Sequence, residues 1–139
     1  MSFLLDTNAI SEPGRPTPDP SFVAWFDAAP ETEIFLSVIT LGELRRGVAL
    51  LPPGARRTGL EGVHQAILRR YGRQIIPIDT AIALTWGEIT ASHRRRGRSP
   101  SMSDELIAAT ALNRNLTVVT RNVVDFEASG CRILSPWSA

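Results

Sequence analysis

Short apolar runs alternate along the chain with longer stretches whose apolar residues recur at helical spacing. The runs are two to five residues long, which suits strands that are buried on both faces of a sheet. They lie at residues 2–5, 34–36, 75–78, 116–120 and 133–134. We therefore expect four strands, with the last and shortest run as a fifth.

The stretches between the runs predict helices. Apolar positions on one helix face occur in residues 22–29, 38–51, 60–71, 80–96 and 103–112. A short polar side chain at the start of a helix accepts a hydrogen bond from the helix backbone. The predicted caps of this kind are Ser37, Asp79 or Thr80, and Ser103.

Three segments are predicted to be irregular. Thr7 and Asn8 follow the first run as turn formers. Residues 12–20 hold four prolines and a glycine, which predicts a surface loop. Residues 98–101 form a linker around Pro100.

Strands that alternate with helical stretches imply crossover connections, and strands joined by crossovers run parallel. Helices then cover both faces of the sheet. We predict an α/β fold, a three-layer α/β/α sandwich with a mainly parallel sheet of four to five strands. The chain has 139 residues, no internal repeat and no long linker, so we expect one domain over residues 1–139.

The composition is that of a globular protein, with 43% hydrophobic and 21% charged residues. No run approaches the roughly 20 apolar residues that cross a bilayer. Asp6 interrupts the apolar start too early for a secretory signal. The single cysteine, Cys131, forbids an internal disulfide and a zinc site built on cysteines. We expect a cytoplasmic protein without a membrane segment.

All 15 basic side chains are arginines, set against 14 acidic ones for a net charge of +1. This balance argues against binding of nucleic acid through bulk positive potential. A guanidinium still suits bidentate contact with a phosphate or a carboxylate. The cluster Arg94, Arg95, Arg96 and Arg98 suits either an RNA backbone or a solvated helix end favoured by the helix dipole.

Four acidic residues from distant parts of the chain lie near predicted strand ends. Asp6 ends the first strand, and Glu43 lies in the helix that follows the second. Asp104 precedes the fourth strand and Asp125 follows it. Ligands of open parallel sheets bind outside the carboxyl ends of the strands. We therefore expect the four carboxylates to converge at that edge.

Carboxylates at contact distance raise one another's pKa and oppose folding unless a cation joins them. Oxygen ligands without thiolate or imidazole favour Mg²⁺, with Mn²⁺ as the alternative. Such a site activates water and binds phosphate oxygens, which predicts hydrolysis of a phosphodiester. Taken singly, each acid also has a structural interpretation, as a strand-end turn, a helix-start or loop acid, or a solvated helix position.

Four segments resemble, in order, the acidic motifs of the PIN-domain ribonuclease family, and in particular its VapC toxins and their FitB branch. They are residues 4–8 (LLDTN), 37–44 (SVITLGEL), 104–111 (DELIAATA) and 120–126 (TRNVVDF), and the tail at 135–137 (SPW) is similar to that of the FitB branch. Any one motif alone is weak. All four in order, over nearly the full length, make the resemblance strong.

The resemblance implies a Mg²⁺-dependent endoribonuclease that is the toxin of a toxin–antitoxin pair. Its metal-binding and catalytic residues would be Asp6, Glu43, Asp104 and Asp125. It also implies a homodimer and a cognate antitoxin that inhibits the toxin and contacts operator DNA. The hairpin of residues 38–71 is the antitoxin surface that we expect. Transfer, ribosomal and messenger RNA all stay open as targets.

Polar side chains beside the acids are expected to support them. The resemblance implies this role for Thr7 or Asn8 and for Thr120 or Asn122, and our choice is Asn8, Thr120 and Asn122. At strand ends, hydroxyls and amides also satisfy backbone groups.

Glu105 departs from the family pattern, which usually has a small or apolar residue directly after the third acid. Successive helix residues point about 100° apart, so Asp104 and Glu105 cannot both face one metal. The register of the motif selects Asp104. We expect Glu105 to face solvent, with an arginine partner as the alternative.

Two other groups of side chains have structural interpretations. His64 and His93 belong to no metal-spacing motif and are predicted to be structural or surface residues. Phe22, Trp25 and Phe26 have helical spacing, which favours core packing or a protein interface over an RNA stacking platform.

Two other classes of function remain open. One is a domain with this fold that binds a partner or RNA without cutting it. The other is a phosphatase of the haloacid dehalogenase type, with a strand-end aspartate as nucleophile. That chemistry usually needs a second aspartate two residues on, where this chain has Asn8, and a lysine, which the chain lacks.

Overall fold

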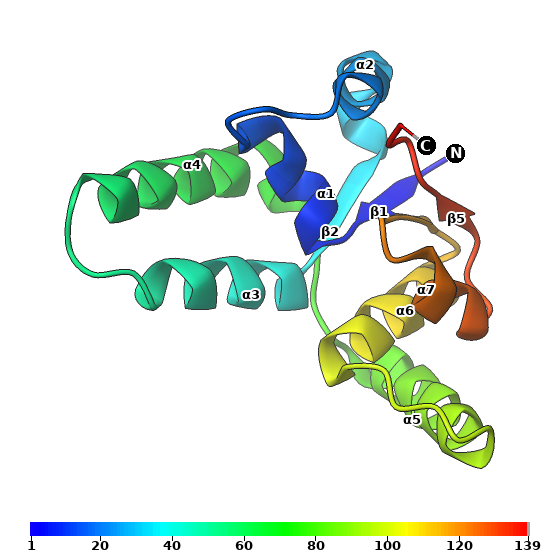
Figure 1. The fold of residues 1–139 in the computed structure, drawn as a ribbon. Coiled ribbons are helices and arrows are strands. Elements are labelled where there is room, and N and C mark those ends of the chain that lie inside the picture. The colour runs from blue at the N-terminus through cyan, green and yellow to red at the C-terminus, as the bar shows by residue number, and fades with distance from the viewer. Residues whose placement is uncertain (139) are drawn as a thin grey trace.

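Five parallel strands form a sheet at the centre of the molecule (Figure 1). The computed structural model describes residues 1–138, in which the strands are Phe3–Leu5 (β1), Ile34–Ser37 (β2), Ile75–Ile76 (β3), Thr117–Val119 (β4) and Ile133–Leu134 (β5). Their order is β3-β2-β1-β4-β5, and every neighbouring pair is parallel. The predicted strands and their direction are confirmed.

Helices connect the strands and cover the sheet. Within residues 1–138 they are Thr7–Ser11 (α1), Pro20–Ala28 (α2), Val38–Ala49 (α3), Ala55–Tyr71 (α4), Thr80–Arg95 (α5), Met102–Arg114 (α6) and Val123–Ala128 (α7). Short 3₁₀ turns lie at Glu12–Gly14, Glu31–Glu33 and Gly72–Gln74. Every crossover between consecutive strands contains at least one helix, as parallel pairing requires. The α/β/α prediction is confirmed.

The side chains of β1 alternate between two apolar cores, one on each face of the sheet. Phe3 and Leu5 belong to one core, together with Phe22 of α2. Leu4 belongs to the other, together with Ile107 of α6. The central strand is therefore buried on both faces, as its uninterrupted apolar sequence predicts.

The turn predicted at Thr7 and Asn8 is wrong, because these residues begin α1. Asp6 has extended backbone, and its carboxylate accepts a hydrogen bond from the backbone N–H of Ala9 at 2.9 Å. An aspartate in this position is an effective helix cap. The acid that ends β1 thus also starts the next helix.

The two helices that carry Asp104 and Asp125 also differ from prediction. Ser101, and not Ser103, caps α6, and its hydroxyl accepts from the backbone N–H of Asp104 at 3.1 Å. The earlier start lets the Ser101 carbonyl accept the first helical bond, from Glu105. No helix was expected after β4, but α7 lies there with Asp125 in its first turn.

The loop predicted for residues 12–20 is wrong at its first residue. Glu12 begins a 3₁₀ turn and is only 1% exposed. Its carboxylate accepts hydrogen bonds from the indole N–H of Trp137 at 2.6 Å and from the backbone N–H of Asp19 at 3.2 Å. The bond from Trp137 is the main cause that holds the pKa of Glu12 below its usual value. A charge can be buried here because donors surround it.

The aromatic residues of α2 pack inside the protein, as their spacing predicts. Phe22 is fully buried, and its ring centroid lies 4.6 Å from that of Trp137. Trp25 makes an edge-to-face contact with Phe3, with the ring centroids 5.1 Å apart. Such aromatic pairs add to the energy of burial.

The predicted helical hairpin and two predicted caps are confirmed. α3 and α4 lie side by side (Figure 1). Ser37 caps α3 and Asp79 caps α5, and each side chain accepts a backbone N–H bond, at 3.0 and 2.9 Å.

No helix in the described part of the chain has both the length and the apolar character needed to cross a bilayer.

Candidate functional site

Acidic side chains gather at the carboxyl edge of the sheet. Asp6 directly follows β1, and Glu43 lies in the second turn of α3, which starts directly after β2. Asp104 and Asp125 lie in the first turns of α6 and α7. We call these four residues the carboxylate cluster.

Asp6 is the most buried member, with 5% of its surface exposed. The hydroxyl of Thr120 donates to Asp6 Oδ2 at 2.5 Å, and the backbone N–H of Ala9 donates to Oδ1 at 2.9 Å. The same hydroxyl accepts from the backbone N–H of Asn122 at 2.9 Å. Thr120 therefore lies where a supporting residue was predicted, directly after β4.

Thr7, rather than Asn8, contacts Glu43. The Thr7 hydroxyl donates to Glu43 Oε1 at 2.6 Å, and the guanidinium of Arg46 lies 3.9 Å from Oε2. Asn8 lines a separate hollow with Arg121, and no hydrogen bond within residues 1–138 joins it to the carboxylate cluster. Thr7 and Asn8 are successive residues of helix α1. Such residues point about 100° apart, so the side chain of Asn8 points away from Glu43 when that of Thr7 contacts it.

Asn122 links Asp104 and Asp125. Its Nδ2 amide donates to Asp104 Oδ2 at 3.2 Å and to Asp125 Oδ2 at 3.0 Å. A side-chain amide has two hydrogens, one for each carboxylate. Arg98 lies beside Asp125, with its guanidinium 3.9 Å from Asp125 Oδ1.

Burial and mutual repulsion raise the pKa of two members. For Asp6 the largest cause is desolvation, and the charges of Asp104 and Glu43 add to it. For Asp104 desolvation again leads, followed by the charge of Glu43, while the charge of Asp125 adds less. Asp6 and Asp104 therefore each feel the charges of other members of the carboxylate cluster.

The donor chemistry of the carboxylate cluster suits a hard divalent cation, because its ligand atoms are oxygens and their repulsion is what a cation removes. However, no three His, Cys, Asp or Glu side chains within residues 1–138 are arranged to hold one ion together. Their oxygens face Thr7, Thr120 and Asn122 instead. The donors fit Mg²⁺, and a common coordination geometry is not preformed.

Glu105 does not face solvent, and that prediction is wrong. It is 7% exposed, and it accepts a hydrogen bond from His93 Nδ1 at 2.8 Å. His93, at the end of α5, is 1% exposed, which confirms its structural interpretation. Asp104, the residue that the register of the motif selects, lies in the carboxylate cluster. No local pattern shows that α5 would bring a histidine against the next residue.

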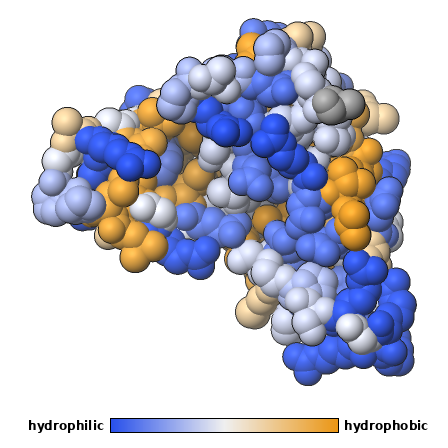
Figure 2. Space-filling view, in the orientation of Figure 1, coloured by the Kyte–Doolittle hydropathy of each residue, from blue (hydrophilic) through white to orange (hydrophobic). Residues whose placement is uncertain are grey.

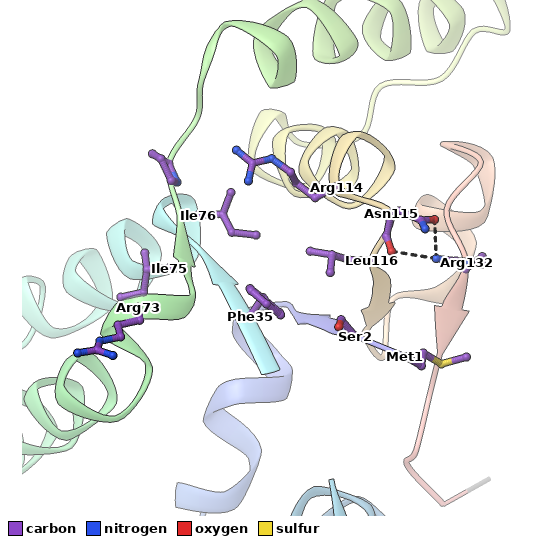
Figure 3. Close-up of a pocket in the computed structure, with 11 residues that line it drawn as sticks. Met1, Ser2, Phe35, Arg73, Ile75, Ile76, Arg114, Asn115, Leu116 and Arg132 are labelled. Atoms are coloured by element: carbon purple, nitrogen blue, oxygen red, sulfur yellow. Dashed lines mark hydrogen bonds between the residues drawn. The ribbon is translucent and has the colours of Figure 1, made fainter. Parts of the chain in front are cut away.

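A large cavity lies at the opposite edge of the sheet (Figure 3). It measures about 680 Å³, and apolar side chains that include Phe35, Ile76 and Leu116 line it. Arg114 and Arg132 also line it, and they pair with Asp79 and with Asn115 respectively. No member of the carboxylate cluster reaches this cavity. Size alone would select it, but titratable groups with shifted pKa values gather at the carboxylate cluster, and we place the candidate site there.

We expect the charges of Asp6 and Asp104 to destabilise the metal-free protein increasingly as the pH rises from about 4 toward neutrality. Their pKa values are raised in the folded state. Between the unfolded and folded pKa values the folded state binds more protons, so the free energy of unfolding falls as the pH rises. In EDTA, the gain in Tm from Asp104→Asn should therefore be smallest near pH 4 and largest at neutral pH. A gain that is independent of pH would contradict this.

The family model of the PIN domain matches residues 3–127 of this chain. Toxin FitB of Neisseria gonorrhoeae is 41% identical over 135 residues, covering 96% of this chain and 97% of that protein. VapC ribonuclease Y4jK of Sinorhizobium fredii is 36% identical over 135 residues, covering 96% of each. Among solved structures, FitAB bound to an IR36 DNA fragment has a TM-score of 0.92 at 38% identity, covering 99% of this chain and 96% of that chain. The matched residues 3–127 include the whole carboxylate cluster.

Proposed function

This chain belongs to the PIN domain family, and on that premise we propose that it is a divalent-metal-dependent endoribonuclease, the toxin of a toxin–antitoxin pair. The carboxylate cluster at the carboxyl edge of the sheet carries the proposal. Two relatives that cover nearly the whole chain support it, one named a toxin and the other a ribonuclease.

The members of the carboxylate cluster would hold Mg²⁺, or Mn²⁺ in its place, through their oxygens. A bound cation neutralises phosphate charge and makes water a better nucleophile at neutral pH. The chain's own polar groups orient the acids. Thr7 donates a hydrogen bond to Glu43 and Thr120 donates one to Asp6, while Asn122 links Asp104 and Asp125. Because repulsion within the cluster opposes folding, we expect metal binding to stabilise the fold.

Two arginines lie beside the carboxylate cluster and suit the substrate backbone. Arg46 and Arg98 each lie 3.9 Å from a member, Glu43 and Asp125 respectively, and their side chains are 70% and 38% exposed. Phosphate contacts supply most of the sequence-independent affinity for RNA. We assign these guanidinium groups to RNA phosphates on the two sides of the cluster.

Cleavage of RNA by the purified chain, freed of any partner, tests the proposal. We expect discrete new 5′ ends in total RNA with Mg²⁺ or Mn²⁺ and none in EDTA. The cation, at about 100 times its Kd, should raise the free energy of unfolding by about 2.7 kcal/mol. A folded protein that binds no cation and cuts no RNA would instead be a binding module. Turnover of a phosphate monoester without RNA cleavage would indicate another phosphohydrolase.

We further propose that an antitoxin covers the hairpin of α3 and α4. Figure 2 shows hydrophobic surface over this hairpin, where Leu50, Val63 and Leu68 are 79%, 47% and 47% exposed. A hollow of about 150 Å³ between the helices is lined by Leu41, Leu44 and Leu68 among others. An exposed apolar patch of this kind is typical of a protein interface. The structural relative FitAB is bound to an IR36 DNA fragment, and we propose that this chain likewise assembles with an antitoxin on operator DNA.

Leu68→Ala should weaken antitoxin binding about tenfold, because truncating a contact worth about 1.4 kcal/mol changes Kd by that factor. Leu84→Ala is the matched control, since Leu84 is 70% exposed on α5, away from the hairpin. Titration of labelled antitoxin peptide measures both. Equal affinity of the two variants for the antitoxin would show that the antitoxin binds elsewhere on the protein. Light scattering of the toxin alone tests the homodimer that we propose with it.

A further inference from the structure

We propose that His93, Glu105 and Ser129 form a positioning network that fixes α7, and with it Asp125, against the helix that carries Asp104. The inference rests on the proposed function, because it gives the network a purpose at the carboxylate cluster. No hydrogen bond joins the three side chains to a carboxylate of the cluster within residues 1–138. They are therefore positioning residues and not catalytic ones.

The first link joins α5 to α6. His93 and Glu105 have side chains that are 1% and 8% exposed, and His93 Nδ1 donates to Glu105 Oε2 at 2.8 Å. Glu105 directly follows Asp104 in the chain. A buried pair of this kind adds little net stability over apolar residues of the same size. Its directional hydrogen bond does fix how α6 is rotated against α5, and so the direction in which Asp104 points.

The second link joins α5 to α7. His93 Nε2 lies 3.2 Å from the hydroxyl of Ser129, and that hydroxyl lies 3.2 Å from the backbone carbonyl of Asp125. One imidazole thus bridges the residue after Asp104 to the backbone of Asp125. The network and Asn122 hold the same pair of acids from opposite sides, Asn122 through their carboxylates and the network through the helices.

Helix α7 is short, so polar links add to the packing of its buried side chain. It has six residues, and Phe126 is its buried side chain. Arg96, the residue that follows α5, donates a hydrogen bond to the carbonyl of Ala128 at 2.7 Å. This bond is a third link to the same end of α7. Directional bonds at one end of a short helix set the direction of its first turn, where Asp125 lies.

Ser129→Ala tests the network with little disturbance of the fold, since it removes one partly exposed hydroxyl. Ser92→Ala is the matched control, because Ser92 precedes His93 on α5 and its hydroxyl makes no hydrogen bond within residues 1–138. We expect Ser129→Ala to lower Mn²⁺ affinity, measured calorimetrically, about tenfold. We expect kcat for RNA to fall similarly with KM unchanged, and the control to match wild type in both.

A second pair of variants removes the two links one at a time. His93→Asn retains a donor near Nδ1 for Glu105, and His93→Gln retains near Nε2 an amide that can either donate to or accept from the Ser129 hydroxyl. Either should lower Mn²⁺ affinity, and saturating Mn²⁺ should restore much of the lost kcat. In the metal-free protein, the amide NMR signals of Asp104 and Asp125 should shift in Ser129→Ala and stay in place in Ser92→Ala.

The outcomes distinguish this inference from the proposed function. If wild type binds Mn²⁺ and cuts RNA while Ser129→Ala equals Ser92→Ala in affinity, kcat and amide shifts, the positioning network is overturned and the nuclease stands. If wild type neither binds Mn²⁺ nor cuts RNA, the proposed function fails first. The amide shifts still report whether the network holds α7.

Discussion

Asp104→Asn will remove RNA cleavage and relieve growth arrest while leaving the protein folded. Asp104 is close enough to Glu43 and Asp125 that the charges of both raise its pKa. The amide that replaces it cannot offer an anionic ligand to the cation. Loss of one group that stabilises charge in a transition state costs about 10²- to 10³-fold in kcat. Initial rates on a defined RNA at saturating Mg²⁺ measure this.

The same substitution should stabilise the metal-free fold by about 1 kcal/mol, because it removes a half-buried charge from a repulsive cluster. Asp27→Asn is the matched control, since Asp27 is exposed on α2 and belongs to no cluster. It should leave both activity and Tm near those of wild type. Undiminished toxicity of both Asp104→Asn and Asp6→Asn would remove the carboxylate cluster from the mechanism.

Trp137→Ala should lower the free energy of unfolding by about 3 to 5 kcal/mol, as truncation of a large buried aromatic residue does. Trp137 is 9% exposed, and its ring packs against Phe22. Its indole N–H is also the main group that keeps buried Glu12 charged at low pKa. The variant therefore leaves a cavity and a buried carboxylate that has lost its best donor. Urea unfolding followed by circular dichroism gives the value.

Trp137→Phe separates packing from hydrogen bonding. Phenylalanine retains most of the ring surface and removes the donor to Glu12, so the loss should be smaller, about 1 to 3 kcal/mol. The kcat of the folded fraction should be unchanged, because Trp137 touches no member of the carboxylate cluster. Stability equal to wild type in Trp137→Ala would show that this contact does not hold the fold together.

The strands and the acids could be predicted because their signals are local. Each strand is a short apolar run between polar segments, and each member of the carboxylate cluster lies beside a strand or in a motif of a few residues. Parallel topology then brings Asp6 and Asp104 to the same edge without further information. The parallel direction of the strands and the layers follow from the same alternation of strands and helices, whereas the order of the strands in the sheet does not.

Two of the errors concern contacts that form only when separate elements pack together. Glu12 and Trp137 are 125 positions apart, and Glu105 meets His93 only because α5 packs on α6. The choice of Thr7 over Asn8 depends on a five-residue helix that exists because Asp6 caps it. Local propensity is too weak to predict so short a helix. These contacts are decided by tertiary packing.

The position of β1 has a consequence for synthesis on the ribosome. This strand precedes the other strands in the sequence, lies in the middle of the sheet and pairs on one side with β4, more than a hundred residues later. Pairings of such long sequence separation form late. Until β4 and α7 have been translated, Asp6 lacks Thr120, and Asp104 lacks Asn122. On the proposed function, we therefore expect a nascent chain that has not yet been translated through α7 to be inactive, because it lacks Asp125 and the side chains that support the other acids.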